Sequence, residues 1–300
     1  MSGFTVGVIG AGAVGQSVAA LLVQERWCAR LMIAARTQES ATGLVTDLED
    51  MREITQSSVR AETAPVTAMH AANAIVVCPR ATFTNTATND IRMAGLTANA
   101  PLIADLAREL AGYTGVVIVV TNPVDVLTRL FATTMGEPTR VYGIGSSTDS
   151  ARYRIALAAH HCVAPSTVRG WVIGEHGDGA VICASTATVS GRRAEVPLPY
   201  VRAQLAARPR QINAGIGRTR CGPAGAVLAA LRKTLGISDG TEALSVNHDG
   251  VWLGIPLRFT AGHPTVCLPD LDPGELRRFA ASRTKLDSVF HQIHQGDLAC

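Results

Sequence analysis

Two short segments of the chain combine the residue types needed to move a proton and to hold a carboxylate. His176 lies in a glycine-flanked turn, and Asp149 and Arg152 stand one helical turn apart at the start of a predicted helix. An imidazole exchanges protons near neutral pH, and a nearby carboxylate favours its protonated form. A guanidinium group binds a carboxylate through two parallel hydrogen bonds. These residues together predict acid–base chemistry on a substrate that carries a carboxylate.

A third polar segment directly follows a strongly apolar run. Residues 116–120 are Val-Val-Ile-Val-Val, and Thr121, Asn122 and Pro123 come next. A β-branched run of this kind is typical of a central parallel strand, and open α/β sheets bind ligands at the carboxyl ends of such strands. We therefore expect Asn122 at the edge of the sheet where a ligand binds. The Asn122–Pro123 bond could be cis or trans.

The N-terminal segment has the spacing of a dinucleotide-binding turn. An apolar run ends in the sequence GAGAVG, and a helical pattern follows it. In a G-x-G-x-x-G turn, Gly10 would allow the tight bend, Gly12 the close approach of a pyrophosphate, and Gly15 the packing of the helix on the strand. The first N–H groups of that helix, which include those of Ala13 and Val14, would point at the phosphates.

The residues after the second apolar run discriminate between two dinucleotides. NAD-binding folds usually place an acidic residue about twenty residues after the glycines, to bind the ribose hydroxyls. Here that position is Ala35, followed by Arg36 and Thr37. The alanine removes a charge that would repel the 2′-phosphate of NADP, while the guanidinium and hydroxyl groups can bind that phosphate. We therefore expect NADP(H) in preference to NAD(H), the alternative being an Arg36 that points into solvent.

The elements that must position these residues alternate along the first half of the chain. Short apolar runs are separated by longer stretches with helical periodicity. This pattern predicts parallel βαβ units with both faces of the sheet covered. The apolar runs are residues 5–9, 31–35, 74–78 and 116–120, and the helical stretches are residues 14–26, 40–51 and 93–111.

After about residue 145 the predicted elements become mixed and include antiparallel-looking strands. We therefore expect an α/β fold with a Rossmann dinucleotide-binding domain over residues 1–145 and a mixed α+β substrate domain over residues 146–300. The predicted elements of the second domain are a helix at 150–160, a strand at 168–173, an Arg-rich helix from about 200, and strands at 251–259 and 264–268.

The composition excludes several classes of protein. The 300 residues carry a formal net charge of +3, which is too small to suggest a nucleic-acid partner. No apolar stretch is long enough to span a membrane, and we expect no signal peptide, because the N-terminal residues lack a basic region. Seven scattered cysteines without a C-x-x-C pair indicate reduced thiols and argue against a metal site. We expect a cytoplasmic protein that binds no metal.

Motifs along nearly the whole chain resemble the lactate/malate dehydrogenase family. The resemblance implies a doubly wound parallel sheet followed by a substrate domain, hydride transfer between NAD(P)(H) and a 2-oxo or 2-hydroxy acid, and a homodimer or homotetramer. The motifs are GAGAVG, VTNPVDVL at 120–127, GIGSSTDSARYR at 143–154, GEHGD at 174–178, GRTRCGPAGA at 217–226, and the stretch 250–279.

The resemblance also implies a role for each residue at a matching position. His176 would be the general acid or base, Asp149 would orient its imidazole ring, and Arg152 would bind the substrate carboxylate. Asn122 would form a hydrogen bond at the reacting centre and contact the cofactor. Thr219 would line the substrate pocket.

The resemblance also implies that the loop carrying Arg92 closes over the substrate. Arg92 precedes Asn99 by seven residues, which is the family's spacing for the loop arginine that polarises the carbonyl group. Residues 82–91 contain neither Lys nor Arg, whereas malate-specific members carry an arginine there for the second carboxylate. This difference argues against oxaloacetate, and we expect Phe83 or Thr86 at the specificity position.

Two questions stay open on the sequence alone. Arg80 stands near the cofactor where the family usually has a small residue, so it could contact a phosphate or crowd the site. The same catalytic residues could also reduce a C=N bond beside a carboxylate. A non-catalytic dinucleotide-binding module is the alternative from another class, although it would have no need of four catalytic residues.

Overall fold

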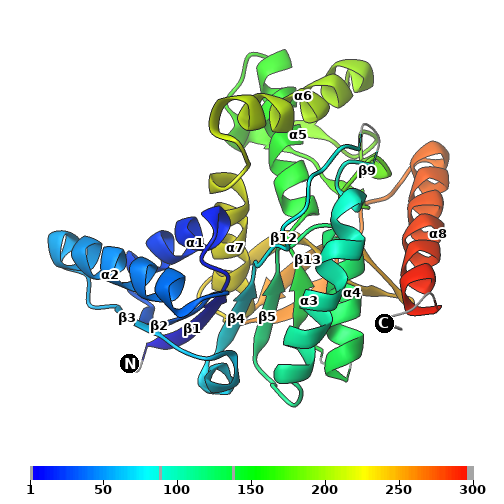
Figure 1. Ribbon diagram of the computed structural model, residues 1–300. Coiled ribbons are helices and arrows are strands. Elements are labelled where there is room, and N and C mark those ends of the chain that lie inside the picture. Colours follow the sequence, from blue (N-terminus) through cyan, green and yellow to red (C-terminus); the bar gives the residue numbers. More distant parts are fainter. Residues whose placement is uncertain (1–2, 88–89, 137–138, 296–300) are drawn as a thin grey trace.

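The computed structural model describes residues 3–87, 90–136 and 139–295. Parallel strands make up the first part of a large central sheet, as the alternation of apolar runs and helical stretches predicts (Figure 1). They lie in the order β3 (Arg60–Thr63), β2 (Cys28–Ala34), β1 (Phe4–Ile9), β4 (Ala74–Val77), β5 (Val116–Val119) and β6 (Val141–Gly143). This is the order of a doubly wound dinucleotide-binding fold.

The same sheet continues into the second half of the chain with antiparallel strands. Beyond β6 the order is β12 (Gly240–His248), β13 (Val251–Thr260), β8 (Val172–Gly174) and β9 (Ala180–Ile182), and β14 (His263–Val266) pairs with β13. The predicted boundary near residue 145 falls after β6, at the change from parallel to antiparallel pairing.

Two groups of helices cover the sheet. In one group α1 (Ala13–Val23) contacts α2 (Gln38–Thr55) and α7 (Cys221–Thr234). In the other α4 (Val124–Met135) contacts α3 (Leu96–Glu109) and α8 (Pro273–Gln295). Because the strand order reverses at β1, right-handed crossovers place the two groups of the dinucleotide fold on opposite faces. Residues of β5 are therefore fully buried, which explains why they are all β-branched.

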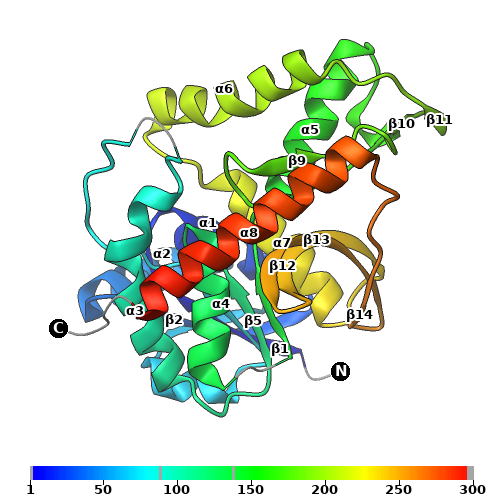
Figure 2. The ribbon, with the colours of Figure 1, turned by 90° about the vertical axis from the view of Figure 1, so that its right-hand side faces the viewer.

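An outer layer stands beyond the end of the sheet where β4 and β5 terminate. It contains α5 (Ser146–His160), α6 (Leu198–Ile216) and a small sheet of β7 (Val168–Arg169), β10 (Thr188–Val189) and β11 (Arg192–Arg193). Figure 2 shows α6 along the top of the molecule and α8 running obliquely below it. Short 3₁₀ turns complete the chain at η1 (Val66–Ala71), η2 (Met93–Gly95) and η3 (Pro165–Thr167).

The structure differs from the sequence-based expectation in two places that matter for the site. The helix predicted from Ser150 begins at Ser146, four residues earlier, so that Asp149 lies in its first turn. The single strand predicted over residues 168–173 is split into β7 and β8, which belong to different sheets. Gly170 separates them, and a Cβ atom there would lie 2.5 Å from the ring of Tyr153. Within the described ranges, no helix is both long and apolar enough to cross a bilayer.

The glycines of the N-terminal turn differ in what surrounds them. Gly10 has a φ of +115°, a conformation that side chains rarely adopt. A Cβ atom on Gly15 would lie 1.7 Å from the carbonyl oxygen of Gly10, whereas a Cβ atom on Gly12 would meet nothing within 4 Å. The fold itself therefore requires glycine at positions 10 and 15. At position 12 the space in front of the backbone is open.

We predict that Gly15→Ala destabilises the fold by about 1–3 kcal/mol, because the turn must open to accept the methyl group. Gly12→Ala is the matched control. It places the same methyl group in open space, and the weaker helix cap costs at most about 1 kcal/mol. Denaturant unfolding of both variants measures the difference. Equal stabilities for the two variants would contradict the packing role of Gly15.

Candidate active site

Four of the predicted catalytic residues meet above the carboxyl ends of the parallel strands. Asp149 and Arg152 lie on α5, His176 lies in the turn between β8 and β9, and Arg92 directly precedes η2. The sheet brings these segments together because β8 joins it through β13, while α5 follows directly from β6. Asn122 follows β5 and lies at the same edge, after which the peptide bond to Pro123 is cis.

The Asp149 carboxylate is the centre of this group. Its Oδ2 lies 2.6 Å from His176 Nδ1, and its Oδ1 accepts a 3.3 Å hydrogen bond from Arg152 Nη1. Arg92 Nη2 approaches the same Oδ1 to 3.5 Å. Because Nδ1 is held by the carboxylate, the Nε2 atom of His176 remains for a substrate. The side chains of Asp149, Arg152 and His176 are all buried.

Burial and charge act in opposite directions on the two partners of this pair. Burial opposes the ionisation of Asp149, but His176 and the two guanidinium groups outweigh it and hold the pKa of the carboxyl below its usual range. Burial and then the charge of Arg92 lower the pKa of His176, against the opposite effect of Asp149. The resting site therefore favours an ionised Asp149 and a neutral His176.

A second buried carboxyl, which the sequence analysis did not single out, supports His176 from the other side. Asp125 on α4 accepts a 2.7 Å hydrogen bond from the backbone N–H of His176. Burial raises the pKa of Asp125 to about 7 despite this bond. The absence of a side chain at Gly145 leaves room for His176, because a Cβ atom on Gly145 would lie 2.6 Å from the Cβ atom of His176. The position of Asp125 within the segment TNPVD was the only signal in the sequence.

The loop that carries Arg92 is tied down by residues that sequence reasoning missed. Lys285 on α8 donates to Asp90 Oδ1 at 2.6 Å and to Glu175 Oε1 at 2.9 Å. The backbone N–H of Asp90 donates to Asp178 Oδ2 at 3.0 Å. The backbone N–H of Glu175 donates to Ser282 Oγ at 2.7 Å. These bonds join the loop, the His176 turn and α8. Within the loop, residues 88–89 lie outside the described part of the chain.

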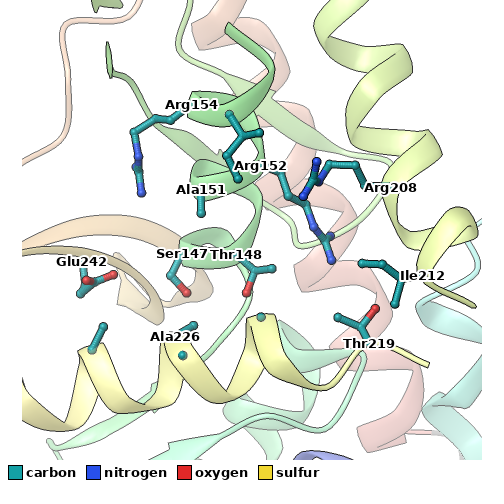
Figure 3. A pocket seen from close by; sticks show the side chains of 14 residues that line it. Ser147, Thr148, Ala151, Arg152, Arg154, Arg208, Ile212, Thr219, Ala226 and Glu242 are labelled. Carbon is teal, nitrogen blue, oxygen red and sulfur yellow. The ribbon is translucent and has the colours of Figure 1, made fainter. Parts of the chain in front are cut away.

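A cavity of about 410 Å³ opens beside the catalytic group, between α5, α6 and α7. Arg152 and Thr219 line it, as Figure 3 shows, so the structure brings these two predicted substrate residues together. The other two lie elsewhere. Phe83 packs under the guanidinium group of Arg80, whose carbon is 4.1 Å from the ring centroid. Thr86 is exposed.

The N-terminal turn and α1 fit a dinucleotide. The open space before Gly12 is a cradle that a side chain would fill, and α1 begins at Ala13 with its N–H groups and positive dipole end facing that space. Val14 lies in the same first turn and is half-buried. The neighbouring strand ends are braced by Asn99, which donates to the backbone oxygen of Asn122 at 2.9 Å and accepts from the N–H of Ala81 at 2.8 Å.

Arg36 and Thr37 lie at the carboxyl end of β2, next to this turn. Arg36 donates to the carbonyl oxygen of Arg80 at 2.9 Å and to Thr82 Oγ1 at 3.3 Å. Thr37 caps α2, with its hydroxyl oxygen 3.3 Å from the N–H of Ser40. The guanidinium group of Arg36 is thus fixed in direction but still exposed.

Comparisons with known proteins agree with the fold. Residues 4–143 match the family model described as lactate/malate dehydrogenase, NAD binding domain. The chain is 30% identical to L-lactate dehydrogenase 1 of Staphylococcus aureus (strain JH9) over 256 residues, which is 83% of this chain and 78% of that relative.

Solved structures share the architecture over nearly the whole chain. The minor L-lactate dehydrogenase of Enterococcus mundtii, in a ligand-bound form, has a TM-score of 0.89 at 24% identity and covers 98% of this chain and 99% of its own. The lactate dehydrogenase of Cryptosporidium parvum, complexed with lactic acid and β-nicotinamide adenine dinucleotide, has a TM-score of 0.87 at 20% identity, with coverages of 97% and 98%. At these identities the likeness is one of fold.

We predict that the pKa of His176 in the free protein lies below the usual value of about 6.5 for an imidazole. Arg92→Gln should raise that pKa, because a neighbouring positive charge is removed. Arg92→Lys is the matched control and should leave it nearly unchanged. NMR titration of labelled imidazoles measures the three values, and the signal missing in His176→Asn identifies the residue. An Arg92→Gln protein with an unshifted pKa would refute this electrostatic coupling.

Proposed function

The chain belongs to the lactate/malate dehydrogenase family of oxidoreductases, and from this premise we propose that it interconverts a 2-oxo acid and a 2-hydroxy acid. One observation carries the proposal. The buried pair of His176 and Asp149 lies beside Arg152 and Arg92, at the edge of the sheet that adjoins the dinucleotide cradle. A proton donor, its orienting carboxylate, a group that binds the substrate carboxylate and a group that polarises the carbonyl are what this reaction requires of a protein.

Each residue of the site has a separate role in the proposed reaction. A bound nicotinamide dinucleotide would supply the hydride for reduction or accept it in oxidation. Arg152 binds the substrate carboxylate, and Arg92 polarises the carbonyl group from the closed loop. His176 gives its Nε2 proton to the carbonyl oxygen, or takes it back in the reverse direction. Asn122 forms a hydrogen bond at the reacting centre, and Thr219 contacts the rest of the substrate.

Substrate binding should itself prepare the proton donor. In the free site the charge of Arg92, and to a lesser degree that of Arg152, lowers the pKa of His176. A bound carboxylate neutralises part of this positive charge, so the pKa of His176 rises and the imidazole holds its proton. Asp149 stabilises the imidazolium ion formed in this way. The acid is thus charged when the substrate is in place.

We further propose that the cofactor is NADP(H) in preference to NAD(H). Ala35 puts no carboxylate at the end of β2, and Arg36 stands next to it with its guanidinium group directed by Arg80 and Thr82. Thr37 adds a hydroxyl group at the N-terminus of α2, where the helix dipole also favours a phosphate. Gly10, Gly12, Ala13, Val14 and Gly15 would hold the pyrophosphate.

Membership of the family also supports proposals about the localisation, oligomeric state and domain organisation of the enzyme. We propose a cytoplasmic homodimer or homotetramer that binds no metal, with a dinucleotide domain over residues 1–145 and a catalytic domain over residues 146–300. Light scattering measures the assembly directly.

The test of the reaction is oxidation of NADPH, followed at 340 nm, with a panel of 2-oxo acids. We expect turnover by the unmodified protein and a loss of about 10²–10⁴-fold in kcat for His176→Asn, which removes the proton donor. Binding of NADPH, followed by fluorescence, should survive in this variant and serves as the control. Absence of turnover with every acid would favour a non-catalytic dinucleotide-binding module. Equal, measurable rates for the two proteins would refute the role of His176 as proton donor.

The test of the cofactor is the affinity for NADPH and NADH in the unmodified protein and in Arg36→Ala. Loss of a charge-assisted bond to the 2′-phosphate costs about 1.5–3 kcal/mol, or roughly ten- to a hundredfold in affinity for NADPH. The affinity for NADH should hardly change, because NADH carries no such phosphate. If the unmodified protein binds both dinucleotides equally well, the proposed preference is wrong.

A further inference from the structure

The cavity beside the catalytic residues has a wall that the sequence analysis did not consider. Helix α6 runs across one side of it and presents Arg208 and Ile212, opposite Thr148 and Arg152 of α5 (Figure 3). Helix α7 forms another side of the cavity, and the residues that it contributes to the lining are glycines and alanines. An arginine therefore lines the same space as the proposed carboxylate-binding residue, and it comes from a different element.

Arg208 has no hydrogen-bond or ion-pair partner in the part of the chain that the structure describes. Its Nε atom is fully buried and without a hydrogen bond, and none of its nitrogens pairs with a carboxylate among residues 3–87, 90–136 and 139–295. Buried polar groups in proteins are nearly always satisfied, and an unpaired charged group is costly. Arg208 lines the same cavity as Arg152, so a ligand in that cavity is the partner that the geometry leaves for its guanidinium group.

The charged groups that act on Arg152, together with Arg152 itself, do not balance. Arg92, Arg152 and Arg208 bring three positive charges, and Asp149 is the carboxylate that offsets them. The positive charge of Arg208 acts directly on Arg152: burial first, and then Arg92 and Arg208, lower the pKa of Arg152 against the pull of Asp149. When one substrate carboxylate binds Arg152, the three arginines are offset by two negative charges, so that one positive charge stays unbalanced. A second acidic group would cancel it.

The opposite end of the cavity needs no such ligand. Glu242 there accepts a 2.9 Å hydrogen bond from Lys233, and Arg154 donates to the carbonyl oxygen of Gly170 at 3.3 Å. In Figure 3 Arg154 and Glu242 both lie on the side away from Arg208. Both charged groups that line this end therefore have hydrogen-bond partners, whereas Arg208 at the other end has none among the described residues.

We infer that Arg208 is a specificity-determining residue that binds a second acidic group at the far end of the substrate side chain. The substrate class is then the 2-oxo dicarboxylic acids, and this inference rests on the proposed dehydrogenase function. It differs from the expectation, drawn from the sequence, that the substrate carries no second carboxylate. The loop at 82–91 indeed lacks a cation, but α6 supplies one from the other side of the cavity.

The experiment compares each dicarboxylate with the neutral 2-oxo acid of equal chain length: oxaloacetate with 2-oxobutyrate, 2-oxoglutarate with 2-oxovalerate, and 2-oxoadipate with 2-oxohexanoate. The readout is the ratio of the two kcat/KM values. In the unmodified protein at least one dicarboxylate should exceed its neutral partner by about tenfold or more. In Arg208→Gln that ratio should fall by about ten- to a hundredfold, mainly through KM, because ground-state and transition-state binding are lost together.

Two further variants serve as controls for the charge and for the position of Arg208. Arg208→Lys retains the charge and should keep part of the preference. Arg210→Gln removes an exposed arginine two residues along the same helix and should leave the ratio unchanged. A melting temperature close to that of the unmodified protein confirms that each variant is folded.

The outcomes separate this inference from the proposed function. Turnover of neutral acids as fast as, or faster than, every dicarboxylate overturns the role of Arg208 and leaves the dehydrogenase proposal standing. A dicarboxylate preference that Arg208→Gln does not reduce also overturns it. Failure to turn over any of the six acids contradicts both proposals.

Discussion

The rest of the site depends on one buried anion, the carboxylate of Asp149. A charge removed from water is tolerated only where other charges and hydrogen bonds compensate it. Here His176, Arg152 and Arg92 provide that compensation from a turn, a helix and a loop that lie far apart in the sequence. The arrangement fixes the imidazole ring and the two guanidinium groups relative to one another before any substrate arrives. Preorganisation of this kind lowers the cost of reaching the transition state.

The fold and the centre of the site could be predicted because their signals are local. The glycine turn, the apolar runs and the one-turn spacing of Asp149 and Arg152 each follow from the backbone geometry of a single segment. The position of His176 beside Asp149 follows from the family motifs. The small sheet with β7 was missed, because it arises from the pairing of β7 with β10, about twenty residues later in the chain.

Other functional residues could not be predicted, since their roles arise from contacts between distant elements. Asp125 accepts a hydrogen bond from the backbone N–H of His176, 51 residues later in the chain. Lys285 donates to Asp90 in the loop, 195 residues earlier in the chain. Arg208 looks in the sequence like one of several arginines on a basic helix, and only the cavity distinguishes it. The contact of Phe83 with Arg80 likewise joins two residues whose pairing the sequence does not indicate, and the expectation of Phe83 or Thr86 at the specificity position stays a prediction.

The contacts of α8 also bear on when the enzyme can first become active during its own synthesis. The hydroxyl that holds the backbone of Glu175 belongs to Ser282, 107 residues later in the chain, and the ammonium group that joins this turn to the loop belongs to Lys285. Chains emerge from the ribosome N-terminus first and fold in that order. The dinucleotide-binding strands are therefore complete long before the catalytic turn has its support. The site is therefore completed only after α8 has been synthesised and has packed against the His176 turn.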